Sequence, residues 1–170
     1  MKSCFLLLFA TLCAKIPCTK SQAGNVIAGV RATQSTTGAH FADASNAIDG
    51  NKDSRFRHSS CSRTRRQSRP WWRVDLENHY RVYVVSITSA KSRRCGRLNG
   101  AEIRIGDTLE NNGNSNTLCA RINSMPSGQT VNFYCKPAGV HGRYINIFLP
   151  RCRSSLTLCE VEAFGVHEPH

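Results

Sequence analysis

The chain has 170 residues, enough for one domain with a hydrophobic core, and its formal net charge is +12. Its longest apolar run, residues 4–14, is too short to span a bilayer, so no transmembrane segment is expected. Such a basic chain attracts anions such as sulfated or sialylated glycans, anionic lipid or nucleic acid, although basic loops also serve simply to keep a secreted protein in solution.

The chain begins with the features of a secretory signal peptide. Lys2 gives a positive start, and the short apolar run follows it. Cleavage after Ala14 and cleavage after Ala23 both fit the sequence. We therefore expect a secreted, extracellular protein with a signal peptide over 1–23, one domain over 24–166 and a tail over 167–170.

Nine cysteines are present, and three of them, Cys4, Cys13 and Cys18, lie in or beside the signal segment. Six remain, and an even number in an oxidising compartment predicts three disulfide bonds. There is no Cys-x-x-Cys pair, so a zinc site is not expected. The six are Cys61, Cys95, Cys119, Cys135, Cys152 and Cys159.

The segment Asn46–Asn51 places three oxygen-bearing side chains around the tight-turn dipeptide Asp49-Gly50. Calcium takes six to eight oxygen ligands and accepts amide and backbone carbonyl oxygens as well as carboxylates. The segment is therefore a candidate calcium turn. On these residues alone, an ordinary surface turn is the simpler interpretation.

After a polar, basic stretch from Arg55 to Arg69, which we expect to be surface loop, short runs of alternating apolar residues follow one another. Gly, Pro, Asn and Ser turns separate them, which predicts an all-β sandwich or barrel. One helical turn fits within Asp107–Asn116. The expected strands centre on residues 72–76, 82–87, 101–105, 131–134, 144–149 and 156–164.

Two of these runs change phase, within 82–87 and at Cys159–Glu160, and each change predicts a β-bulge. Adjacent side chains of a strand point to opposite faces, so we expect Trp72 in the core and Trp71 partly exposed. Arg73 and Asp75 share a face and are expected to form an ion pair.

An enzyme is not expected. The chain has no Gly-x-Ser-x-Gly motif, no phosphate-binding glycine loop and no metal-binding spacing among its six histidines. Only Asp49 and Glu160 are candidates for a convergent carboxylate pair, and calcium is the better use for them. No nucleic-acid reader motif occurs, so a nucleic-acid partner is not expected either.

Six motifs in this order resemble the F-type lectins, the fucolectin–tachylectin-4–pentraxin-1 domain, over about residues 24–165. The resemblance implies a β-sandwich jelly roll of the galactose-binding-domain type, with a structural calcium ion and a shallow fucose site at the loop end. The motifs are Asn46–Asn51, Ser60-Cys61, Pro70–Leu76, Arg97–Gly100, Gly142–Tyr144 and Leu156–Glu162.

The resemblance also assigns ligands and cysteine pairs. It implies disulfide bonds Cys61–Cys159 and Cys119–Cys135, with Cys95 and Cys152 left as the third pair. The implied calcium ligands are Asn46, Asp49, Asn51, Ser60, the backbone carbonyl of Cys159, and Glu160.

The sequence departs from the family at the sugar site. Family members use a His, then Arg-x-Asp, then a second Arg. Here only the last arginine is kept, as Arg97, while Arg63 stands at the His position. Ala90 and Ser92 replace the first Arg and the Asp, and Lys91 or Arg93 could substitute for the lost arginine. An adjacent cysteine pair of some members falls on Arg93 and Arg94.

Without a carboxylate, Arg63, Arg93, Arg94 and Arg97 would repel one another unless they are solvated or an anion completes the site. We therefore hypothesise a carbohydrate-binding protein whose pocket prefers anionic glycans over plain fucose. The alternative is an interaction or scaffold protein that has lost sugar affinity. The family further implies surface glycans, including microbial ones, as partners in innate defence, and a homotrimer.

Overall fold

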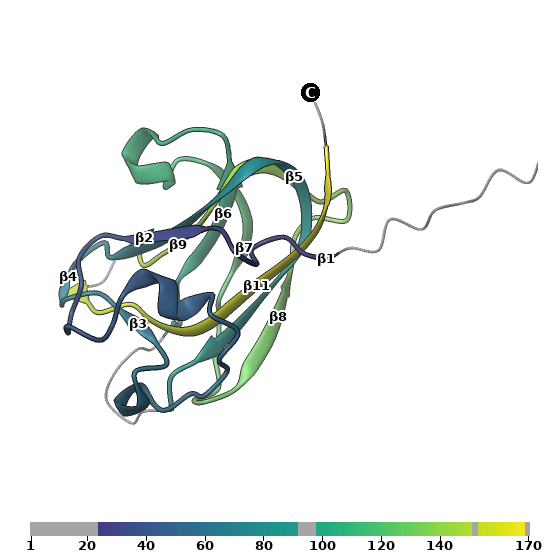
Figure 1. Cartoon of the computed structure of the whole chain (residues 1–170). Coiled ribbons are helices and arrows are strands. Elements are labelled where there is room, and N and C mark those ends of the chain that lie inside the picture. The colour runs from purple at the N-terminus through teal and green to yellow at the C-terminus, as the bar shows by residue number, and fades with distance from the viewer. Residues whose placement is uncertain (1–23, 92–97, 151–152, 169–170) are drawn as a thin grey trace, which may run out of the picture.

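The computed structural model describes residues 24–91, 98–150 and 153–168, and in them the chain is an antiparallel β-sandwich with three short 3₁₀ turns (Figure 1). The expected all-β fold is confirmed, and the helical turn expected within Asp107–Asn116 is η3. None of the helices in these described ranges is long and apolar enough to cross a membrane. The expected signal peptide lies outside them.

The elements follow one another as β1 (Gly24–Asn25), β2 (Arg31–Gln34), η1 (Ala44–Ala47), η2 (Phe56–His58), β3 (Ser62–Arg63), β4 (Gln67–Ser68), β5 (Trp71–Ser89), β6 (Glu102–Gly106), η3 (Glu110–Gly113), β7 (Thr117–Arg121), β8 (Thr130–Tyr134), β9 (Val140–Phe148), β10 (Arg153–Ser154) and β11 (Thr157–His167).

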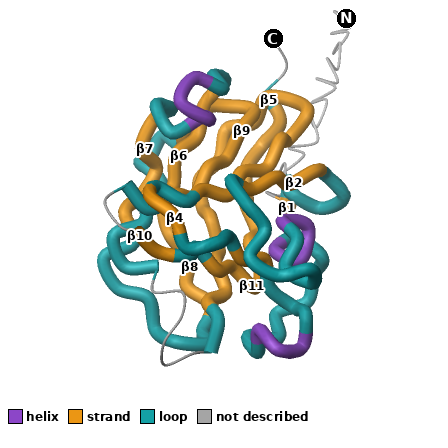
Figure 2. Tube along the Cα trace, turned by 90° about the vertical axis from the view of Figure 1, so that its left-hand side faces the viewer, coloured by secondary structure: helices purple, strands orange, loops and turns teal. Residues whose placement is uncertain are grey.

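Strand β5 organises the sandwich. The main sheet has the strand order β1-β11-β5-β9-β6-β7, while β2 and β8 also pair with β5, and β3 pairs with β11. A separate two-stranded sheet joins β4 to β10 at the surface (Figure 2). Neighbouring strands are antiparallel throughout, which is typical of a sandwich rather than of a βαβ fold.

The two strands expected at 72–76 and 82–87 are one continuous strand with a bend. Glu77 has a φ of 64°, and the register with β9 shifts between Asp75 and Tyr80. Before the bend β5 pairs with β2 and β9, and after it β5 pairs mainly with β11 and β8. The Glu-Asn-His segment at the bend therefore passes the chain from one layer to the other without ending the strand.

Both expected bulges are confirmed. Phe164 of β11 pairs with Val84 but Gly165 pairs with Val82, so Tyr83 of β5 has no paired residue in β11. This extra residue shifts the alternation of apolar side chains along β5. The second register shift falls between Leu158 and Glu160. In an unbroken strand Leu158 and Glu160 would point to the same face. The extra residue in the bulge, Cys159, changes this alternation.

Trp72 is fully buried, as expected, and its Nε1–H donates to the carbonyl oxygen of Ala44 at 2.9 Å. Trp71, on the opposite face, is partly exposed. The indole thus both fills the core and fixes η1 against β5. Other large, fully buried side chains of this core are Ile27, Leu76, Ile87, Leu98, Ile103, Ile105, Ile122, Ile145, Ile147, Leu149 and Leu156.

The expected ion pair between Arg73 and Asp75 is wrong. Asp75 binds Arg143 of β9 instead. The guanidinium of Arg73 lies 5.0 Å from the ring centroid of Trp71 and donates to the carbonyl oxygen of Asn112. Stacking on an aromatic ring occupies Arg73, and the neighbouring strand brings a better-oriented arginine to the carboxylate.

Strand β11 also extends further than the expected domain boundary. His167, assigned to the tail from the sequence, pairs with Tyr80, and Glu168 forms an ion pair with Arg81. The backbone N–H of Glu168 donates to the carbonyl oxygen of His79 at 3.0 Å. The described C-terminal residues are therefore part of the sheet edge.

Candidate functional site

Cys61 and Cys159 form a disulfide bond across 98 residues of sequence, and Cys119 pairs with Cys135 across 16. Both bonds are those that the family resemblance implied. The first joins the loop after η2 to the bulge at the start of β11. Ser60 and Glu160, which are each adjacent in sequence to one of these cysteines, are thereby linked through the disulfide. Cys95 and Cys152 lie outside the described residues.

The turn after η1 is held by its own side chains. The backbone N–H of Asn51 donates to Asp49 Oδ1 at 2.9 Å, and the N–H of Asp53 donates to Asn51 Oδ1 at 3.0 Å. Gly50 between them has a φ of 82°, which glycine adopts without strain. These local bonds fix the direction in which the turn presents its oxygens.

Glu160 is the unusual residue of this region, because its side chain is only 2% exposed and its Oε2 has no hydrogen-bond partner among the residues described. Burial, together with the nearby carboxylates of Asp49 and Glu162, raises the pKa of Glu160 to about 7, although a hydrogen bond from the Gly50 N–H and the charge of Lys52 oppose them. An unpaired buried carboxylate is costly unless a cation or a proton neutralises it.

Two further implied ligands, Asn46 and Ser60, are held by hydrogen bonds to neighbouring loops. Asn46 donates through Nδ2 to the carbonyl oxygens of Phe41 and Ser59, which leaves its Oδ1 as the acceptor of the amide. Ser60 is buried and donates through Oγ to the carbonyl oxygen of Asp53 at 2.6 Å. The bond from Asn46 to the Ser59 carbonyl and the Cys61–Cys159 disulfide thus connect the three motifs that contain Asn46, Ser60 and Glu160.

This donor set fits a hard cation. Within the described ranges no cluster of three or more His, Cys, Asp or Glu side chains is placed to hold a metal. An ion here would depend on two carboxylates supplemented by amide, hydroxyl and backbone oxygens, which is the chemistry that calcium accepts and zinc does not prefer. Calcium at this place stays a prediction.

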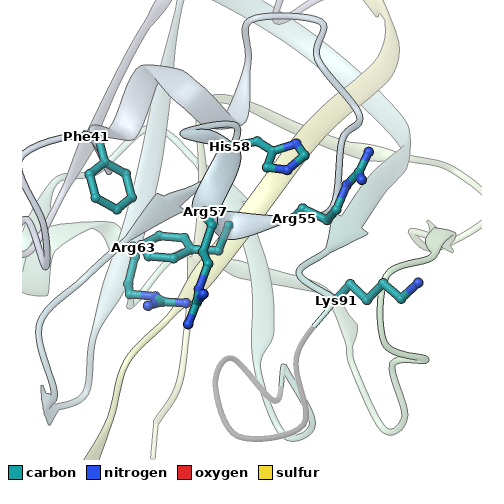
Figure 3. A pocket seen from close by; sticks show the side chains of 7 residues that line it. Phe41, Arg55, Arg57, His58, Arg63 and Lys91 are labelled. Carbon is teal, nitrogen blue, oxygen red and sulfur yellow. The ribbon is translucent and has the colours of Figure 1, made fainter.

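A pocket of about 580 Å³ opens beside η2 and β3 (Figure 3). It is lined by Phe41, Arg55, Phe56, Arg57, His58, Arg63 and Lys91. Two of these are aromatic, four are cationic and one is an imidazole, whereas no Asp or Glu is among the described residues that line it. The pocket is therefore an aromatic floor surrounded by positive charge.

Arg63, the expected ligand-binding residue at the family's His position, does line this pocket. Its guanidinium carbon lies 3.2 Å from the ring centroid of Phe56, and its Nε–H donates to Thr157 Oγ1 at 3.1 Å. Phe56 in turn packs against Phe41, with ring centroids 5.2 Å apart. Stacking and a hydrogen bond fix the orientation of this arginine.

The other cations come from η2 and from the end of β5. In Figure 3 the side chains of Arg57 and Arg63 extend in the same direction, while Lys91 lies across the view from them. Asp53 pairs with Arg55 and with His58, whose Nδ1 lies 2.7 Å from Asp53 Oδ2. The Asp53 carboxylate accepts the backbone N–H of Arg55, and this bond, with the side chains of Arg55 and His58, lowers the pKa of Asp53 to about 2.

Sequence reasoning identified only part of this lining. Alignment with the family offers Lys91 as a substitute for the lost arginine, and the composition of the basic stretch from Arg55 indicates only a surface loop. Phe41 and Phe56 carried no signal, because isolated aromatic residues in a polar loop show no periodicity. Arg93, Arg94 and Arg97, the other expected binding residues, lie outside the described residues.

Comparison with known proteins agrees with this geometry. Residues 46–147 match the family model described as a NedA-like, galactose-binding domain. Fucolectin-3 of Anguilla japonica is 49% identical over 143 residues, which cover 81% of this chain and 77% of that protein.

Solved structures give the same result. The fucolectin from striped bass (Morone saxatilis) serum superposes with a TM-score of 0.80 at 45% identity, covering 85% of this chain and 48% of the bass chain. A fucose binding module of Streptococcus pneumoniae has a TM-score of 0.69 at 28% identity, covering 84% and 95%.

The jelly-roll sandwich, with its pocket at the loop end, places the chain among the carbohydrate-binding lectins rather than among enzymes. Within that class, the chain belongs to the fucolectin, or F-type lectin, family.

Proposed function

We propose that this chain is a secreted lectin that binds fucose-containing glycans of the family type, with its preference altered towards anionic glycans. The names of its relatives support fucose as the family ligand. The residues of its own pocket support the altered preference. Cell-surface or microbial glycans in innate defence are the biological setting that this family membership suggests.

The observation that carries the proposal is the pair formed by Arg63 and Phe56. A stacked arginine stands where the family uses a histidine, and Arg57 and Lys91 add further positive charge. A guanidinium donates two parallel hydrogen bonds to a sulfate or a carboxylate, so these groups suit the pocket better than a neutral hydroxyl does. A sialic acid or a sulfated sugar would neutralise the charge.

A structural calcium ion is part of the proposal. Asn46, Asp49, Asn51, Ser60, the Cys159 carbonyl and Glu160 would hold it, and the unpaired Oε2 of Glu160 supports this assignment. When bound, the ion would neutralise the Asp49 and Glu160 carboxylates. The turn's own hydrogen bonds and the Cys61–Cys159 link keep η2 in position to form the pocket wall.

A second candidate, a scaffold protein without sugar affinity, is favoured by Ala90. This residue stands at the family's first arginine position and is 3% exposed, so it offers no side-chain donor to a sugar. A homotrimer, suggested by family membership, would compensate for weak sites, because clustering raises avidity without new contacts.

A glycan array at physiological salt separates these candidates. We expect sialylated or sulfated glycans to bind above neutral fucosylated ones, and Arg63→Ala and Arg57→Gln to reduce that binding. Arg31→Gln is the matched control, because Arg31 is also an exposed arginine but lies on β2, opposite Asp75, and does not line the pocket. Tight binding of neutral fucosylated glycans that Arg63→Ala leaves unchanged would refute the altered preference. Absence of binding to every glycan on the array would favour the scaffold protein.

A further inference from the structure

The geometry points to a second anion-binding surface outside the pocket, which we propose binds a linear sulfated polysaccharide. This surface, the arginine strip, consists of Arg65, Arg66, Arg69 and Arg153. It takes the chemical class of its ligand from the proposed glycan recognition, but it uses none of the residues that line the pocket.

The four arginines are exposed, and none of them forms an ion pair with an Asp or Glu of the described ranges. Arg65 donates through Nε to the carbonyl oxygen of Thr37, and Arg66 donates through Nε to that of Arg153, both at 3.2 Å. Each Nε bond steadies the side chain through its inner nitrogen. A guanidinium can donate two parallel hydrogen bonds to an oxyanion through its two terminal nitrogens, which these Nε bonds do not use.

The backbone beneath the strip is well braced. Arg153 and Ser154 pair with Ser68 and Gln67 in the small surface sheet of β4 and β10 (Figure 2). The backbone N–H of Arg65 donates to Thr36 Oγ1 at 3.0 Å. Arginines from two distant parts of the chain are thus held next to each other, as successive contacts for a chain-like ligand require.

Negative charge is segregated away from this surface. The sequence contains no Asp or Glu between Asp53 and Asp75, nor between Glu110 and Glu160. The acidic residues that form ion pairs use cations elsewhere, for example Lys52 with Glu162. Uncompensated charges of one sign raise the local concentration of an oppositely charged ligand and steer it to the surface.

A polysaccharide fits better than a membrane or a nucleic acid. The large apolar side chains that are exposed on the described surface are Leu109 and Tyr134, and neither belongs to the strip. Membrane insertion uses exposed apolar side chains, and single-stranded nucleic acids stack their bases on aromatic ones. Sulfate groups along a sugar chain require only arginine forks.

The test is a titration with a size-defined heparin oligosaccharide, using the full chain and the double variant Arg66→Gln/Arg153→Gln. We expect roughly thirtyfold weaker binding near physiological salt, by analogy with the effect of removing two cations near an anionic surface. The slope of log affinity against log salt should fall by about two. Arg31→Gln/Lys136→Gln removes the same charge from exposed positions outside the strip and should bind nearly as the parent does.

Equal affinities of the two double variants would overturn the arginine strip, provided that their melting temperatures match. Tighter arginine-dependent binding of duplex DNA or of phosphatidylserine vesicles than of heparin would assign the strip to another partner. Binding at the pocket is measured separately. Arg57→Gln should weaken the binding of short glycans on the array, and the Arg66→Gln/Arg153→Gln variant should bind them as the parent does. Failure of the strip and failure of the proposed pocket are therefore different results.

Discussion

Asp75 of β5 and Arg143 of β9 are joined by two hydrogen bonds, from Nε to Oδ1 at 2.7 Å and from Nη2 to Oδ2 at 2.8 Å. The bonds from Arg143 hold the pKa of the Asp75 carboxyl below its usual value, against the opposing effect of burial. The pair lies beside the bend of β5, where that strand starts to change partners. It fastens the bend to the neighbouring strand.

This pair makes the protein sensitive to acid. Because the folded-state pKa of Asp75 is lowered, its contribution to stability is present above the unfolded pKa of about 3.9 and is lost as the pH falls through the lower folded value. We expect Asp75→Asn to lower the Tm at neutral pH by about 2–4 °C and to flatten the acid side of the Tm–pH curve. Asp43→Asn, at an exposed carboxylate without an ion pair to the described residues, should leave both unchanged.

Removing calcium should lower the melting temperature, because an ion that binds only the folded state adds stability by mass action, about 2.7 kcal/mol at a concentration of 100 Kd. The measurement is a thermal melt with and without a chelator. Glu160→Gln should remove the difference between the two melts. Glu162→Gln should keep it, since Glu162 is engaged by Lys52, and a parent protein indifferent to chelation would disprove the site.

The two described disulfide bonds should differ in their contributions. In the chain-entropy model a loop of about 100 residues contributes about 4.7 kcal/mol and one of about 15 residues about 3 kcal/mol. Replacing Cys61 and Cys159 by serine should therefore cost more free energy of unfolding than replacing Cys119 and Cys135. Denaturant titrations of the two variants test this, and the opposite order would contradict it.

The adjacent tryptophans should respond unequally to truncation. Trp72→Ala removes a fully buried side chain and its hydrogen bond to Ala44, and about 3–5 kcal/mol of unfolding free energy should be lost. Trp71→Ala removes a partly exposed ring that stacks against Arg73 and should cost clearly less. Equal losses in urea unfolding would contradict the predicted difference between the buried and the partly exposed ring.

Alternation and phase were enough to predict the sandwich, the burial of Trp72 and both bulges, because each is a property of consecutive residues. The partner of Asp75 was not predictable, since Arg143 is 68 residues away and only pairing between β5 and β9 brings it close. Continuity of β5 was missed for a local reason: the bend at Glu77 has the polar composition of a turn.

The candidate sites divide in the same way. The predicted calcium turn follows from a short, ordered string of residues that matches the family, and Arg63 follows from its alignment with the family's His position. The aromatic floor made by Phe41 and Phe56 depends on how two loops pack, which no local pattern encodes. Its closest sequence signal was the arginine-rich stretch that begins at Arg55.

Strand β11 runs the length of the molecule, and this sets how the domain can be connected to others. Its first residue, Thr157, pairs with Arg63 at the pocket, while Gly165, about 25 Å further along at 3.2–3.4 Å per residue, pairs with Gly24. Both ends of the described chain therefore leave from the side remote from the pocket (Figure 1). Copies joined in series, or attached to another module, would keep their pockets facing outward and unobstructed.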